Sequence, residues 1–534
     1  MPARRSALST DDALNRVALE LNRDTEHRIL FGSDESWTLA ELDRRAGRVA
    51  HRLHERGVRA CDRIGVMAAN HIEWVLADLA CLKVGAVVVG FEPGRFEADR
   101  LISDYGLRAL IVDTDIAAQD VAAQDVITCG EVREWAAEED PSADLDAAPL
   151  HAGYDRADIC AIKFTSGSTG TPKGLEVTAG SVNDSLNAVQ QMFAHGPDDN
   201  LLIFLRLALL QQRYWIYSAL VNGHDVTLAS TDDVLTVAER AGPTVVMGVP
   251  GFYEDLRSQV VAELTVDADL ASRRSAILRR LGGRIRYLWT GSAPASPAVL
   301  AFFNDCGVPL LEGYGLNETC IVAKNHPEAF RVGSVGKVLP NKTVRFDRDG
   351  VLIVGSRTPV NCRFTWCEPG TNERTFLPTG EVKTYDLGRL DEDGFLYIDG
   401  RVDDVLTLSS GRNVLVRLIE EPLCEHPDVA ECVLFGNGCE FLTAIVSPRT
   451  DNLDRAGLAR FVADVNDSLL TEQRVLALVI ATEPFSIDNG LLSSQFKPRR
   501  GDIQRRYSRD LAAVYDGSES GRADIVRVPP APVR

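Results

Sequence analysis

The chain has 534 residues, a length that predicts two or three domains rather than a single core. Its composition, 45% hydrophobic and 25% charged, is typical of a folded globular protein and excludes a fibrous or disordered class. The formal net charge of -20 disfavours polyanionic partners, so no nucleic acid is expected to bind.

The 11 cysteines include no CxxC pair and no cluster with histidine at zinc-binding spacing, so we expect reduced thiols in the core. No leader peptide is visible near the first residue. The apolar stretch 84–91 is too short to cross a bilayer. These features predict a cytoplasmic protein without a membrane span.

Apolar spacing predicts alternating helices and strands in the first part of the chain. Thr38 and Glu41 form a capping-box pattern that begins a helix, and Gly57 can end it. A second helix is expected from about His71, after Asn70 as its cap, to residue 84. Short apolar runs predict buried strands at 86–90, 109–112, 160–164, 226–229, 245–249 and 285–290. This alternation predicts an α/β domain with mostly parallel sheets.

The character of the sequence changes after about Arg401. Two apolar runs, 429–435 and 441–446, flank Gly436-Asn437-Gly438, which predicts a β-hairpin. We therefore expect a large domain over 1–400 and a small α+β domain over 401–515. The tail, 516–534, is rich in Ser, Gly, Pro and charge and is predicted to be disordered.

A segment rich in glycine and hydroxyl groups, TSGSTGTPKG, follows the predicted strand 160–164. Small residues allow backbone N–H groups to turn toward an anion, and the hydroxyls add donors. The spacing does not fit GxxxxGK[ST], which excludes a Walker-type loop. The pattern predicts a phosphate-binding loop made of Thr165, Ser166, Gly167, Ser168, Thr169, Gly170 and the cation Lys173.

This segment resembles the signature loop of the adenylate-forming superfamily, which includes acyl-CoA synthetases, firefly luciferase and the adenylation domains of peptide synthetases. The resemblance covers nearly the whole chain, because further motifs follow in the same order. It implies a large N-terminal domain of stacked α/β sheets and a small mobile C-terminal α+β domain. It also implies ATP and Mg²⁺ as cofactors.

Two further segments resemble the parts of the superfamily that hold the nucleotide. Gly291-Ser292-Ala293 is similar to the segment that lies against adenine, and GYGLNE at 313–318 is similar to GYGxTE. The resemblance implies that Tyr314 stacks on adenine and that Glu318 helps to hold Mg²⁺. It implies further contacts with the nucleotide or metal at Thr165, Gly313, Gly315 and Asn317. Asn317 departs from the pattern, which has Thr there.

The second half of the resemblance concerns the ribose and the hinge. Asp386 corresponds to a carboxylate that accepts hydrogen bonds from the ribose hydroxyls, and Arg401 to a ribose or phosphate contact. Asp403 corresponds to the pivot between the two domains. Lys497, in FKPRR, corresponds to the catalytic lysine of acyl-CoA synthetases. Only eight of the 57 basic residues are lysines, and none lies between 383 and 497.

No protein nucleophile is needed in the implied mechanism, and no GxSxG, HExxH or Cys/His motif suggests one. The substrate oxygen attacks the α-phosphorus and pyrophosphate leaves, so catalysis is positioning plus charge stabilisation. Lys173 and Lys497 are the expected catalytic cations.

The substrate pocket is expected to be altered. Long-chain acyl-CoA synthetases carry a segment like LPLAHxxER, whereas this chain has Arg206 in place of Pro, Leu209 in place of His and Gln212 in place of Glu. An ordinary acyl or aryl acid is one substrate that fits, with a thiol such as CoA or a carrier phosphopantetheine, or an amine, as acceptor. Nitrite adenylation for the diazotisation of an aromatic amine is an alternative. A non-catalytic nucleotide-binding homologue is a third.

Overall fold

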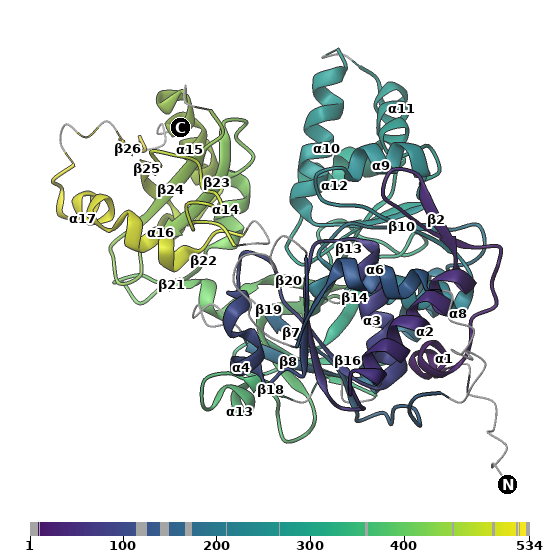
Figure 1. Ribbon diagram of the computed structural model, residues 1–534. Coiled ribbons are helices and arrows are strands. Elements are labelled where there is room, and N and C mark those ends of the chain that lie inside the picture. Colours follow the sequence, from purple (N-terminus) through teal and green to yellow (C-terminus); the bar gives the residue numbers. More distant parts are fainter. Residues whose placement is uncertain are drawn as a thin grey trace, which may run out of the picture. The chain divides into compact units, whose positions relative to one another are not determined.

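Figure 1 shows the computed structural model of the chain. The structure describes residues 9, 11–113, 125–138, 149–165, 173–209, 211–265, 268–357, 361, 363–450, 453–493, 497–519, 522 and 524–529, without the side chain of Asp403. Contacts divide the chain into two compact units. The first unit comprises Met1–Arg345, Ile353–Thr384 and Glu392–Leu396, and the second comprises Phe346–Leu352, Tyr385–Asp391 and Tyr397–Arg534.

Two large sheets form the framework of the first unit. The seven-stranded sheet has the order β18 (Phe364–Trp366), β8 (Lys173–Thr178), β7 (Ile159–Thr165), β4 (Val87–Gly90), β3 (Arg63–Met67), β5 (Ala109–Val112) and β6 (Val126–Thr128). Strands β7, β4, β3, β5 and β6 run parallel, and β8 joins β7 as an antiparallel hairpin. The expected mostly parallel α/β sheet is therefore confirmed.

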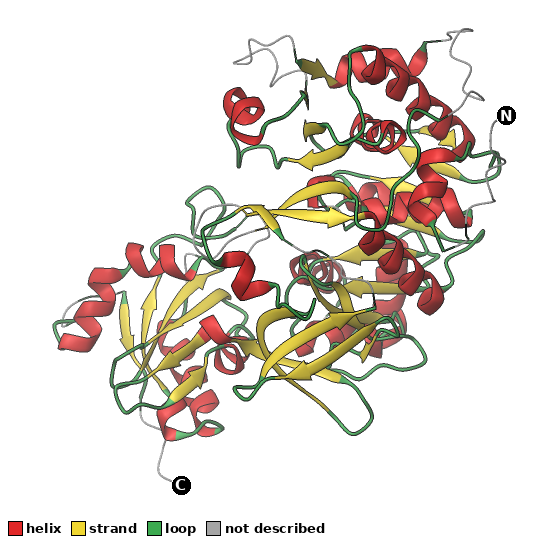
Figure 2. Ribbon diagram, turned by 90° about the horizontal axis from the view of Figure 1, so that it is seen from below, coloured by secondary structure: helices red, strands yellow, loops and turns green. Residues whose placement is uncertain are grey.

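The second large sheet has nine strands. Its order is β15 (Lys337–Val338), β14 (Cys320–Lys324), β13 (Leu310–Leu316), β12 (Tyr287–Thr290), β11 (Val245–Gly248), β9 (Asn200–Ile203), β10 (Asp225–Leu228), β1 (Arg28–Phe31) and β2 (Glu35–Thr38). The strands from β13 to β1 are parallel, and the outer pairs are antiparallel. Figure 2 shows the strands of this unit flanked by helices.

One hydrophobic core joins the two large sheets. It combines strand residues of both sheets with α2 (Leu39–Glu55), α3 (Ile72–Val84), α7 (Ala179–Phe193) and α8 (Arg213–Asn222). Nearly every residue of α3 is buried, because this helix packs inside the core. The other α-helices among the described residues of the unit are α1 (Ala13–Leu19), α4 (Leu101–Tyr105), α6 (Cys129–Ala137), α9 (Val234–Ala241), α10 (Pro250–Glu263), α11 (Leu270–Arg280), α12 (Pro297–Asp305) and α13 (Thr371–Thr375).

The helix boundaries follow the sequence signals with one exception. The Thr38 side chain accepts from the Glu41 N–H at 3.1 Å, and the Glu41 carboxylate accepts from the Thr38 N–H at 2.8 Å, which completes the predicted capping box. The residue before α3 is His71, so Asn70 is not its cap. The Asn70 side chain instead donates to the Leu205 carbonyl at 2.8 Å and accepts from the Leu207 N–H at 3.0 Å.

The second unit contains a four-stranded sheet of order β23 (Val429–Phe435), β24 (Leu442–Pro448), β25 (Val475–Ile480) and β26 (Ile525–Arg527). Strands β23 and β24 form the predicted hairpin. The unit also has β21 (Val405–Thr407), β22 (Asn413–Leu415), α14 (Arg417–Leu423), α15 (Arg455–Asp467), α16 (Arg500–Arg506) and α17 (Ser508–Asp516). A sheet of β16 (Lys342–Phe346), β17 (Val351–Ser356), β19 (Val382–Leu390) and β20 (Leu396–Arg401) contributes strands to both units.

Strand β26 corrects the expectation of a disordered tail. Residues 525–527 pair antiparallel with β25, and Val528 is buried in the core of the second unit. The hydrogen bonds and apolar contacts of this segment offset the entropy of ordering it.

No helix of the described residues is long and apolar enough to cross a membrane.

A buried ion pair fixes α8 to α3. The Asp78 carboxylate lies 2.6 Å from the Arg213 guanidinium and 2.6 Å from the Tyr217 hydroxyl, and all three side chains are buried. We expect Asp78→Ala to lower the free energy of unfolding by roughly 3–5 kcal/mol, because it leaves Arg213 buried and unpaired. Denaturant unfolding measures this. Glu55→Ala is the control, because it removes an exposed ion pair between Glu55 and Arg52. It should lower the free energy of unfolding by less than about 1 kcal/mol.

Candidate active site

The predicted phosphate loop connects two neighbouring strands of the seven-stranded sheet. Thr165 ends β7 and Lys173 begins β8, and these two residues are paired across the hairpin. The predicted loop residues between them (Ser166, Gly167, Ser168, Thr169 and Gly170) lie outside the described residues. Arg95 donates to the Thr165 carbonyl at 3.1 Å and to the Glu92 carboxylate at 2.9 Å, so the end of β7 is held in place.

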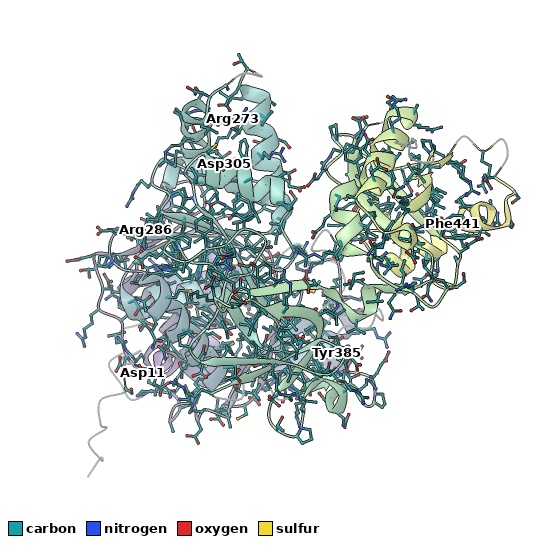
Figure 3. The ribbon with its side chains drawn as sticks, turned by 180° about the vertical axis from the view of Figure 1, so that it is seen from behind. Asp11, Arg273, Arg286, Asp305, Tyr385 and Phe441 are labelled. Carbon is teal, nitrogen blue, oxygen red and sulfur yellow. The ribbon has the colours of Figure 1, made fainter. Side chains whose placement is uncertain are left out.

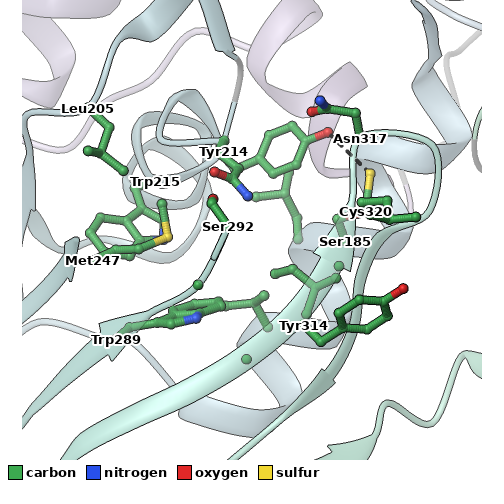
Figure 4. Close-up of a pocket in the computed structure, with 18 of the residues that line it drawn as sticks. Ser185, Leu205, Tyr214, Trp215, Met247, Trp289, Ser292, Tyr314, Asn317 and Cys320 are labelled. Atoms are coloured by element: carbon green, nitrogen blue, oxygen red, sulfur yellow. Dashed lines mark hydrogen bonds between the residues drawn. The ribbon is translucent and has the colours of Figure 1, made fainter. Parts of the chain in front are cut away.

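A pocket in the first unit collects several of the predicted nucleotide residues (Figure 4). The empty space within it, mouth included, is about 950 Å³. The predicted residues that line it are Gly291, Ser292, Gly313, Tyr314, Gly315 and Asn317, which come from the carboxyl end of β12, from β13 and from the turn after β13. Ala293 follows Ser292 and does not line it.

Backbone geometry at this pocket is specialised. A Cβ on Gly315 would lie 2.2 Å from the Cys320 carbonyl oxygen, so only glycine fits there. Ser292 and Cys320 have positive φ values of 69° and 53°, which are uncommon for residues with side chains. Such strain gathers at functional sites. The Asn317 carbonyl accepts from the Asn361 side chain at 2.8 Å, which positions the turn between β13 and β14.

Glu318 lies in the same turn, half-buried, and its charge acts on Lys163 of β7. Thr165 lies two residues further along β7, so side chains at 163 and 165 point to the same face of the sheet. A carboxylate and a hydroxyl are the oxygen ligands that Mg²⁺ prefers. The residues present therefore fit the metal that the sequence predicts.

The second unit brings three other predicted residues together. Asp386, on β19, is buried and forms an ion pair of 3.2 Å with Arg401 at the end of β20. Desolvation lowers the pKa of Lys497, the Arg401 charge lowers it further, and the carboxylates of Asp386 and Asp404 offset part of the shift. The Lys497 ammonium is therefore within electrostatic reach of Asp386 and Arg401. Tyr385, labelled in Figure 3, precedes Asp386 and has a positive φ of 62°.

Two hydrogen bonds connect the backbone of Lys497 with Ser493. The Lys497 N–H donates to the Ser493 hydroxyl at 3.1 Å, and the Ser493 N–H donates to the Lys497 carbonyl at 2.8 Å. Pro498, next in sequence, pairs with Leu492 as an isolated bridge. The predicted pivot, Asp403, lies in the short turn Val402–Asp404.

The three predicted substrate residues, Arg206, Leu209 and Gln212, are not among the residues that line this pocket. Gln212 is buried and accepts from the Phe204 and Leu205 N–H groups at 2.8 and 2.6 Å, which turns its side chain toward backbone. Arg206 is 44% exposed and pairs with Glu92 at 3.1 Å. Leu209 is half-buried outside the pocket lining.

Sequence reasoning missed the residues that do form the pocket walls. Aromatic and apolar side chains dominate them, and Lys163 is the cation among them; the walls include Leu205, Tyr214, Trp215, Met247, Trp289 and Cys320. The Tyr214 hydroxyl lies 3.9 Å from the Cys320 sulfur (Figure 4). The rarity of lysine, and its place within an apolar run, could have indicated Lys163.

Comparison with known proteins identifies the class. The family model described as AMP-binding enzyme matches residues 17–351, and that of the AMP-binding enzyme C-terminal domain matches 403–519. The long-chain-fatty-acid–CoA ligase FadD15 of Mycobacterium bovis is 27% identical over 95% of this chain and 97% of its own length. The 2-succinylbenzoate–CoA ligase of Bacillus subtilis is 28% identical over 77% and 82%.

Solved structures show the same fold. The anthranilate CoA ligase AuaEII in complex with anthranoyl-AMP superposes with a TM-score of 0.76 at 20% identity, over 95% of this chain and 98% of that one. The chain thus shares the fold of this solved structure. The chain belongs to the AMP-binding enzyme family, and it is an AMP-forming ligase.

Proposed function

We propose that the protein adenylates a compact carboxylic acid, with an aromatic acid as the best fit, and transfers the acyl group to a thiol such as CoA or a carrier phosphopantetheine. The aromatic lining of the pocket carries this proposal. Tyr214, Trp215 and Trp289 adjoin the segments expected to hold AMP. Flat rings pack well against such walls.

The size of the pocket favours a ring over a long chain. About 950 Å³, mouth included, has to hold both part of the nucleotide and the acid. Leu186, Val189 and His195 line it from α7 and the residues after that helix, and the described residues around them belong to the packed core. A long acyl chain would need a passage through this core.

The proposed mechanism is an in-line displacement by the substrate oxygen at the α-phosphorus of ATP. Tyr314 would stack on adenine, and Asp386, oriented by its ion pair with Arg401, would accept from the ribose hydroxyls. Lys173 would compensate charge on the outer phosphates, and Lys497 charge on the attacking oxygen and α-phosphate. Thr165 and Glu318 would hold Mg²⁺, which supplies further positive charge for the phosphate oxygens.

The second step requires the small C-terminal domain to move. We place the boundary at residues 400 and 401 and the pivot at Asp403, in the turn Val402–Asp404. A hinge residue absorbs the backbone change between the orientation for adenylation and the orientation for thioester formation.

A second candidate is adenylation of nitrite for the diazotisation of an aromatic amine. Lys163 favours it, because a buried cation in the pocket can bind an inorganic oxyanion as well as a carboxylate. The aromatic walls would then hold the amine.

ATP–pyrophosphate exchange over a panel of acids tests the proposal. We expect exchange with compact aromatic acids, weak exchange with long-chain fatty acids, and consumption of the adenylate when CoA or pantetheine is added. Exchange with nitrite alone, followed by diazotisation of an aryl amine, would replace the first candidate by the second. Binding of ATP without exchange on any substrate would leave only a non-catalytic homologue.

A further inference from the structure

A lysine is buried in the wall of the substrate pocket. Lys163 lies near the end of β7, and only 4% of its surface is exposed. It lines the pocket together with Tyr214 and Cys320. Residues two apart in a strand share one face and are separated by about 6.6 Å along it. Lys163 therefore lies on the same face of β7 as Thr165, that distance before it.

The charge of this lysine has no matched partner among the described residues. Its ammonium group makes no hydrogen bond or ion pair with the residues that the structure describes. The charged side chains that act on it are Glu318, which is expected to hold the metal, and Arg213, which is paired with Asp78.

An ammonium group without a partner in a largely apolar pocket costs stability, since burial of the side chain removes part of its hydration. Methionine or leucine would fill the same volume at lower cost. A residue that lowers stability in a pocket is typical of a functional requirement. The requirement that fits an ammonium facing an aromatic pocket is a negatively charged ligand.

We propose that Lys163 is the oxyanion-binding residue of the substrate pocket and selects a substrate by a carboxylate-like group that its ammonium binds. This inference rests on the proposed function and names the charge of its substrate. The group is planar and singly charged, so it can be the carboxylate that reacts, a second carboxylate on an aromatic acid, or nitrite. The acidic substrate replaces the water that the lysine loses on burial.

The test compares Lys163→Met with the wild type in two measurements. In ATP–pyrophosphate exchange, we expect KM for the oxyanion to rise roughly 10- to 100-fold while KM for ATP stays unchanged. In thermal unfolding without ligand, we expect the melting temperature of Lys163→Met to equal or exceed that of the wild type. Addition of benzoate, isophthalate or nitrite should raise the melting temperature of the wild type but not that of the variant.

Two further variants control the interpretation. Lys324→Met removes another buried ammonium, which faces the Trp289 ring and does not line the pocket, and it should leave KM for the oxyanion unchanged. Lys163→Arg keeps the charge and should keep part of the oxyanion-dependent rise in melting temperature. The three anions identify the group that Lys163 binds. A rise in melting temperature with isophthalate alone indicates a second carboxylate on the substrate. A rise with benzoate indicates the reacting carboxylate, and a rise with nitrite indicates an inorganic substrate.

The outcomes separate this inference from the proposed function. If exchange with an aromatic acid is as strong in Lys163→Met as in the wild type, the oxyanion site is overturned and the proposed function still stands. Loss of the oxyanion-dependent melting shift in Lys163→Met, in a protein that shows no exchange with any acid, supports the site and contradicts the proposed function. A lower melting temperature of Lys163→Met without ligand, together with unchanged KM, would show a structural role.

Discussion

Lys497→Ala is expected to lower the rate of adenylate formation by roughly 10²–10³ while ATP binds with nearly unchanged affinity. The reason is that the charges of Asp386 and Arg401, the residues expected at the ribose and phosphate, act on Lys497. Its positive charge would be needed mainly as charge develops on the attacking oxygen and the α-phosphate. ATP–pyrophosphate exchange measures the rate, and calorimetric titration measures ATP affinity.

Arg499→Ala is the matched control for Lys497→Ala. Arg499 is a neighbouring cation whose removal changes the local charge by the same amount as the removal of Lys497. Its side chain is paired with Asp502 at 2.9 Å. We expect it to leave exchange within a few-fold of the wild type. Equal losses in the two variants, or unchanged exchange in Lys497→Ala, would remove Lys497 from the mechanism.

Glu318→Gln is expected to lower exchange by a similar factor, roughly 10²–10³, and to raise the Mg²⁺ concentration needed for half-maximal rate. The substitution keeps the shape of the side chain but removes the charge that a hard cation requires. Titration of the exchange rate with Mg²⁺ and with Mn²⁺ measures the effect.

Glu328→Gln, at an exposed position after β14, removes a carboxylate of the same unit and serves as control. Its dependence on Mg²⁺ should match that of the wild type. A Glu318→Gln variant with an unshifted Mg²⁺ requirement would mean that the metal is held elsewhere.

Local signals predicted the fold well. The Thr38 capping box and the hairpin around Gly436-Asn437-Gly438 are encoded within a few residues, so neighbouring side chains are enough to specify them. The strand β26 was missed because its three residues gain their hydrogen bonds from β25, which lies far away in the sequence. The segment 525–528, Ile-Val-Arg-Val, carries no local signal of the strand with which it pairs.

The candidate site shows the same division between local and long-range information. Motif order identified several residues that line one pocket, among them Gly313 and Tyr314. Side-chain direction could not be obtained that way: Gln212 turns toward backbone N–H groups, and Arg206 toward Glu92, through contacts set by the tertiary structure. Lys163 was missed because the pocket that it lines is assembled from residues far away in the sequence, such as Tyr214 and Cys320.

The fate of the substrate's oxygen tests the central claim of adenylation most directly. An acid that supports exchange is labelled with heavy oxygen in its carboxylate, converted with ATP and CoA, and the products are analysed by mass spectrometry. Attack on the α-phosphorus predicts that one labelled oxygen appears in AMP and none in pyrophosphate. Label in pyrophosphate or orthophosphate, or AMP without label, would contradict the account.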